Sequence, residues 1–93
     1  MKGVPSYIVE TYLARGQAAE RAARDGRARS AAEEVTHGGM RVRFDRSIHV
    51  AEDEICFFVF VAPSGREAAL VAQCAGLDPI RVVEAVSSEK EET

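Results

Sequence analysis

The chain has 93 residues, of which 29% are charged, and a formal net charge of −3 at neutral pH. This length fits a single domain with a modest core, which we place at 1–93. The acidic balance argues against a general nucleic-acid binder. We find no transmembrane run and no secretory signal. With only two cysteines, we expect a cytoplasmic protein with reduced thiols and no membrane partner.

The first part of the chain predicts a strand followed by a helix. Residues 6–13 (SYIVETYL) are rich in β-branched and aromatic side chains, which favours a strand. The alanine-rich segment 17–36 has apolar positions at helical spacing. We allow a kink or short break at Asp25-Gly26, because glycine weakens a helix. The helix should end at His37-Gly38-Gly39, where glycine supplies a left-handed cap.

Two strands in the middle of the chain carry the strongest pattern. Residues 41–50 alternate between apolar and polar side chains, and residues 55–63 are apolar on both parities. This predicts a half-buried strand beside a central one. The short acidic loop 51–54 favours a hairpin. With Glu52 and Asp53 as the turn, the opposed pairs would be Val50 and Ile55, His49 and Cys56, Ile48 and Phe57, and Ser47 and Phe58.

This register predicts two different faces for the hairpin. We assign one face to the main core, with Phe44, Ile48, Val50, Ile55, Phe57, Val59 and Val61. The other face is mixed, and places the polar side chains of the first strand beside Cys56, Phe58 and Phe60. We expect functional residues on that mixed face.

The last third of the chain predicts a second helix and a final strand. Ser64-Gly65-Arg66-Glu67 has the spacing of a capping box. The helix should run to about Ala75 and end at Gly76. Residues 80–87 form the last strand, which completes a structured core over 6–87. Residues 88–93 are a polar, mostly acidic tail.

The predicted order of elements is β-α-β-β-α-β, which is the ferredoxin-like α+β arrangement. Right-handed crossovers then place both helices on one face of a four-stranded antiparallel sheet. The other face would be open and would show Phe58 and Phe60 with Ile8 and Tyr12. Because an exposed apolar face marks an interface, we predict a homodimer through the open sheet face, a dimeric α+β barrel with an internal cavity.

Several short segments together resemble a known family. They are Arg-Ser-Ile-His-Val, Cys-Phe-Phe-Val-Phe, Ala-Pro-Ser, Ala-Gly-Leu and Ile-Arg-Val-Val-Glu-Ala, with Glu10 in the first strand. Over residues 6–87 the pattern resembles a family of small bacterial ferredoxin-like proteins of unknown function, one member of which binds nickel. The resemblance implies a nickel-binding role. The chain departs from the family at the strand cysteine, which lies two residues earlier, at Cys56, where the family position corresponds to Phe58.

His49 and Cys56 are the first candidate metal ligands. A neutral imidazole and a thiolate suit nickel or zinc, and cross-strand neighbours can share one ion. Glu10 or Glu84, or residues of a second subunit, would have to complete the shell. The structural alternative is a half-exposed histidine beside a small buried cysteine.

Two further hypotheses need no metal. Glu10 or Glu84 could be the base of a cofactor-free isomerase, cyclase or lyase acting on a small molecule. A carboxylate in an apolar cavity has a raised pKa, and His49 or Tyr12 could serve as the acid; this hypothesis rests on fold analogy. The structural alternative for these carboxylates is an ion pair with Arg43 or Arg46. The last hypothesis is an interaction module without chemistry.

Overall fold

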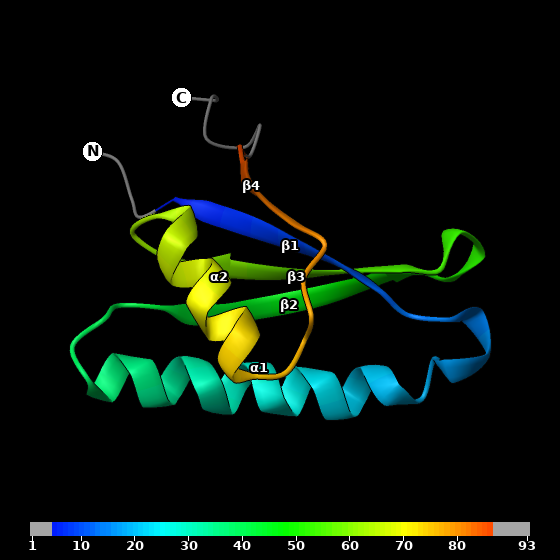
Figure 1. The fold of residues 1–93 in the computed structure, drawn as a ribbon, viewed down its shortest axis with the longest axis horizontal. Helices are drawn as coiled ribbons and strands as arrows, with labels where there is room; N and C mark the ends of the chain where they lie inside the picture. Colours follow the sequence, from blue (N-terminus) through cyan, green and yellow to red (C-terminus); the bar gives the residue numbers. More distant parts are fainter. Residues whose placement is uncertain (1–4, 87–93) are drawn as a thin grey trace, which may run out of the picture.

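A computed structural model describes residues 5–86 of the chain (Figure 1). Its neighbouring strands are all antiparallel, in the order β2-β3-β1-β4. This confirms the α+β, ferredoxin-like arrangement. The predicted tail at 88–93 and position 87 of the last strand lie outside the described residues. The elements are β1 (Ser6–Tyr12), η1 (Arg15–Gln17), α1 (Glu20–His37), β2 (Arg43–Val50), η2 (Ala51–Asp53), β3 (Ile55–Val61), α2 (Gly65–Cys74) and β4 (Arg81–Ala85).

The two helices cover one face of the sheet. Helix α2 crosses in front of the strands in Figure 1 and packs against β1 and β4, whereas α1 runs along the β2 side. Helix α1 is continuous through Gly26, so the allowed break does not occur. No helix of residues 5–86 is long and apolar enough to cross a membrane.

The core lies between the helices and the sheet. Phe44 packs against Phe58 and Phe60, with ring centroids 6.2 Å and 5.4 Å apart. Small buried side chains on both helices, such as Ala28 and Ala68, bring the helices close to these rings. The largest side chains that are fully buried are Phe58, Phe60, Leu13, Val9, Val71, Thr11 and Cys56.

The predicted hairpin register is confirmed, but the predicted core face is wrong. The four predicted pairs, from Val50 opposite Ile55 to Ser47 opposite Phe58, all form. The helices cover the other parity of β3, however, so Phe58 and Phe60 are fully buried instead of exposed on the open face. A strand that is apolar on both parities does not indicate which side the helices cover.

A β-bulge in β2 is a second reason why the predicted faces of the hairpin are wrong. The register shifts between Phe44 and Arg46, so Phe44 lies opposite Phe60 while Ile48 lies opposite Phe57. One extra residue therefore moves Phe44 to the helix-covered face and leaves Ile48 on the other. Strict alternation had placed both side chains on the same face.

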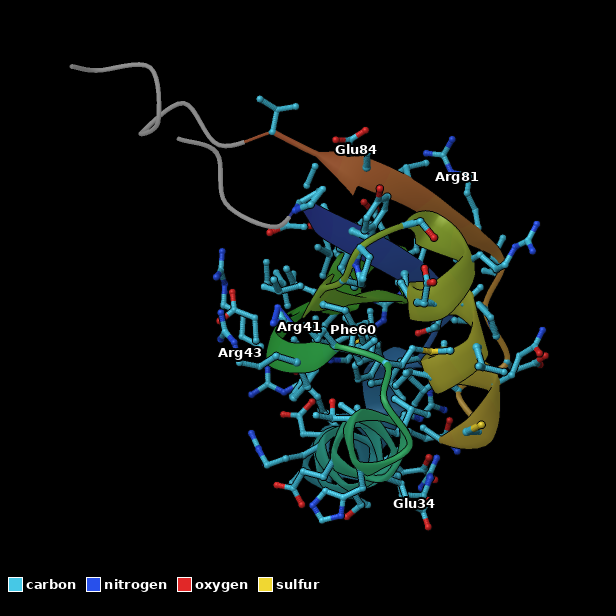
Figure 2. All side chains as sticks on the ribbon, turned by 90° about the vertical axis from the view of Figure 1, so that its left-hand side faces the viewer. Glu34, Arg41, Arg43, Phe60, Arg81 and Glu84 are labelled. Carbon is cyan, nitrogen blue, oxygen red and sulfur yellow. The ribbon has the colours of Figure 1, made fainter. Side chains whose placement is uncertain are left out.

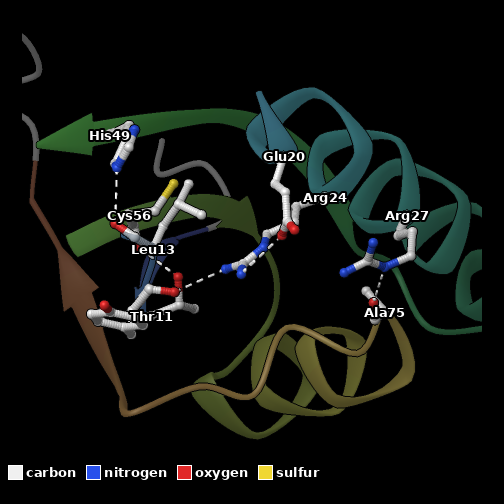
Figure 3. Close-up of polar contacts among 9 residues, drawn as sticks. Thr11, Leu13, Glu20, Arg24, Arg27, His49, Cys56 and Ala75 are labelled. Carbon is white, nitrogen blue, oxygen red and sulfur yellow. Dashed lines mark hydrogen bonds and ion pairs between the residues drawn. The ribbon is translucent and has the colours of Figure 1, made fainter. Parts of the chain in front are cut away.

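Helix α2 begins and ends close to the predicted positions, but the contacts of its N-cap residue differ from those predicted. Ser64 is the N-cap, but its hydroxyl donates to the Glu67 carboxylate and does not cap the backbone. Gly76 has a φ of 71°, the left-handed conformation expected after a helix. The Arg27 Nε of α1 donates to the Ala75 carbonyl oxygen at 2.8 Å, which ties the two helices together (Figure 3).

Candidate functional site: the open face of the sheet

The sheet face away from the helices carries apolar side chains on all four strands, and on β2 it also carries Arg43 and Arg46, which lie opposite Val61 and Val59. Three of its large side chains are well exposed: Tyr12 at 56%, Ile48 at 43% and Val83 at 37%. Near the centre, Val59 is only 6% exposed and lies between Ile8 of β1 and Arg46 of β2. From the register, the apolar residues of this open face are Ile8, Tyr12, Ile48, Val50, Ile55, Phe57, Val59, Val61 and Val83. An exposed apolar patch on a small domain is typical of an interaction surface.

One ion pair lies on the open face, between β1 and β4. Glu10 and Arg81 are opposed in the register, and the Arg81 Nε donates to the Glu10 Oε1 at 3.2 Å. The Glu10 side chain is 20% exposed and that of Arg81 is 64% exposed. The partner of Glu10 is therefore Arg81, not Arg43 or Arg46, because β4 neighbours β1 and β2 does not.

The second candidate carboxylate, Glu84, is not brought together with Glu10. Glu84 lies opposite Tyr7, on the parity of β4 that faces the helix side. It is exposed on this edge strand, as Figure 2 shows. Tyr12, by contrast, follows Glu10 by two residues and shares the open face. The structure therefore groups Glu10, Tyr12 and Arg81.

His49 and Cys56 are cross-strand partners on the helix-covered face (Figure 3). The His49 Nε2 lies 3.1 Å from the Leu13 carbonyl oxygen, at the end of β1. Cys56 is fully buried. Burial raises the pKa of the Cys56 thiol, the Asp25 carboxylate raises it further, and Arg21 and Arg24 partly lower it. A raised pKa makes the thiolate, which is the form that binds metals, harder to form.

Glu10 does not join the metal-ligand set predicted with His49 and Cys56. Side chains alternate along each strand, and Glu10 lies opposite Phe57 on the open face, whereas Cys56 lies on the covered face. Among residues 5–86, no three His, Cys, Asp or Glu side chains gather closely enough to hold a metal ion. Nickel or zinc binding stays a prediction.

The two thiols should differ strongly in reactivity. Cys74 is exposed and Cys56 is buried, and neither forms a disulfide. Because the thiolate is the reactive form, we expect a thiol reagent at pH 8 to modify one cysteine per native chain quickly. Peptide mapping should identify it as Cys74, and Cys56 should react only in denaturant. A fast-reacting thiol in the Cys74→Ser variant would contradict the burial of Cys56.

The sequence correctly placed Ile8 and Tyr12 on the open face, but it missed Arg81 there and assigned Ile55 and Phe57 to the core face. A signal for Arg81 was present: pairing the first and last strands antiparallel can place an arginine opposite Glu10. For Phe57 and Ile55 no such signal existed, because both parities of β3 are apolar.

No protein-family model, curated protein or solved structure matches this chain.

Proposed function

We propose that the protein is a homodimer, joined through the open faces of its two sheets, that binds a small organic acid beside Glu10, Tyr12 and Arg81. The observation that carries this proposal is the largely apolar open face, which holds the opposed charges of Glu10 and Arg81 between β1 and β4 and, on β2, Arg43 and Arg46. The reaction class that suits these groups is cofactor-free proton transfer of the isomerase, cyclase or lyase type.

The area of the open face is large enough for a second copy of the chain to pack against it. Four strands about 4.8 Å apart, with residues about 3.3 Å apart, make a face of roughly 20 by 20 Å. Two such faces bury roughly 800 Å² as planes, and side-chain relief raises this toward the range of stable interfaces, about 1,200–2,000 Å². In a two-fold dimer each apolar patch meets its own copy, so the surfaces match in chemistry.

The Glu10–Arg81 ion pair supplies the groups that would bind and act on a ligand at the open face. The Arg81 guanidinium can bind a ligand carboxylate with two parallel hydrogen bonds, and Glu10 would then be released from its partner. A released carboxylate beside apolar side chains can take a proton from a carbon next to a carbonyl. The exposed Tyr12 phenol can donate to that carbonyl oxygen. A covering subunit would exclude water and strengthen each of these interactions.

Binding of small keto and carboxylic acids tests this site. We expect amide shifts in the NMR spectrum of the native protein to map to β1 and β4. Arg81→Gln should weaken binding about tenfold or more, because charged hydrogen bonds contribute about 1.5–3 kcal/mol. Glu10→Gln removes the carboxylate that competes with the ligand for Arg81 and should tighten binding. The matched control is Glu84→Gln, which removes an exposed carboxylate from β4, the strand of Arg81, and should leave affinity unchanged. Equal effects of Glu84→Gln and Glu10→Gln would contradict the proposal.

Metal binding through His49 and Cys56 is the second candidate. It is favoured by their predicted and observed pairing, and by the contact between His49 Nε2 and Leu13. If Nε2 donates there, Nδ1 keeps a lone pair for a metal. Calorimetric titration of untagged protein with nickel tests this. Stoichiometric binding lost in His49→Ala and Cys56→Ser supports it, and no binding below about 100 μM excludes it.

A further inference from the structure

A basic groove lies between α1 and the β2 edge. Its floor is apolar, with Val42 6% and Phe44 7% exposed. The Arg29 guanidinium lies over the Phe44 ring, 5.3 Å from the centroid. The groove continues past Arg41 and Arg43 to Val61 at the end of β3. Figure 2 shows Arg41 and Arg43 on this side of the molecule. We call the three arginines and this floor the arginine groove.

The arginine groove concentrates positive charge in an acidic chain. Within residues 5–86 the ion pairs are formed by Arg24, Arg46 and Arg81, and by none of the three groove arginines. Glu33 is the only carboxylate among the described residues that line the groove. The chain as a whole has a net charge of −3. The groove therefore has the charge to hold an acidic occupant.

The sheet topology brings the end of β4 to the same end of the sheet as the arginine groove. Ala85 lies opposite Ser6, Ser6 opposite Val61, and Val61 opposite Arg43. This row crosses three strand spacings, about 14 Å. Residues 87–93 have the sequence SSEKEET, with three glutamates and one lysine. Seven residues can span about 23 Å, so this segment is long enough to reach Arg41 and Arg43.

We infer that the acidic segment 87–93 docks on the arginine groove of its own chain and competes with other anions for it. The opposite charges, the shared end of the sheet and the length of the segment all support this occupant. Docking between exposed charges is weak and sensitive to salt. Higher ionic strength would therefore release the segment from the groove. The inference does not depend on the ligand proposed beside Glu10.

Paramagnetic relaxation in the full chain tests this docking. A spin label on Thr93→Cys, in a Cys74→Ser background, should broaden the amides of residues 41–44. The control amides are those of residues 77–81, which lie toward the opposite end of the sheet. Neutralising Glu89, Glu91 and Glu92 to glutamine should reduce the relaxation enhancement at 41–44 at least threefold, as should 0.5 M sodium chloride. Lys90→Gln, which leaves the acids in place, should not reduce it.

Two further experiments test the docking. One uses arginine variants, and the other mixes isotope-labelled chains with spin-labelled chains. Arg41→Gln with Arg43→Gln should remove the enhancement, whereas Arg66→Gln, an exposed arginine of α2, should leave it unchanged. Enhancement that is equal in the glutamine variants would overturn the inference. At a protein concentration where the chain is monomeric, enhancement in an isotope-labelled chain mixed with spin-labelled, isotope-free chains would also overturn it, because the segment would then reach another copy.

Discussion

Replacing Phe58 with alanine is expected to lower the free energy of unfolding by about 3–5 kcal/mol. Phe58 is fully buried under the helices and packs against Phe44. Truncation leaves a cavity that the surrounding aromatic rings can fill only in part. Since a domain of this size has a total stability of about 5–15 kcal/mol, the loss should be plain in equilibrium urea unfolding.

Phe57→Ala is the matched control, because it makes the same change one residue away on the open face. At low protein concentration, where subunit contacts contribute little, Phe57→Ala should lower the free energy of unfolding clearly less than Phe58→Ala does. A larger cost at Phe57 than at Phe58 would mean that the helices cover the other face of the sheet.

Replacing Ile48 with aspartate is expected to weaken dimerisation at least 100-fold, which corresponds to about 2.7 kcal/mol. Ile48 is 43% exposed on the open face, and two-fold symmetry would bury two new carboxylates in one interface. Size-exclusion chromatography with light scattering measures the change in mass.

Leu70→Asp provides the matched control for surface charge. Leu70 is 39% exposed, on α2 and away from the open face, so this variant should keep the wild-type mass. If both aspartate variants dissociate, or if neither does, the open face is not the dimer interface.

The element order and the hairpin register were predictable because local patterns determine both. Period-two alternation, a four-residue acidic loop and glycines after each helix depend only on nearby residues. Pairings between distant segments were harder to predict. Glu10 meets Arg81 across 71 positions of sequence, and no local pattern indicates that β1 pairs with β4 on that parity.

The candidate metal site shows where sequence reasoning had to fail. His49 and Cys56 were correctly paired, because one hairpin contains both. The face they share was assigned wrongly, since β3 is apolar on both parities and the bulge beside Phe44 breaks the alternation of β2. Glu10 was therefore grouped with side chains that lie on the opposite face of the sheet.

Sedimentation equilibrium of the wild-type protein, from micromolar to several hundred micromolar, tests the proposed interface most directly. We predict a reversible monomer–dimer equilibrium that approaches twice the 10.1 kDa mass of the chain. A mass of 10.1 kDa at every concentration would contradict the account. The apolar open face would then need a different partner, and Glu10 would lack the cover that its proposed chemistry requires.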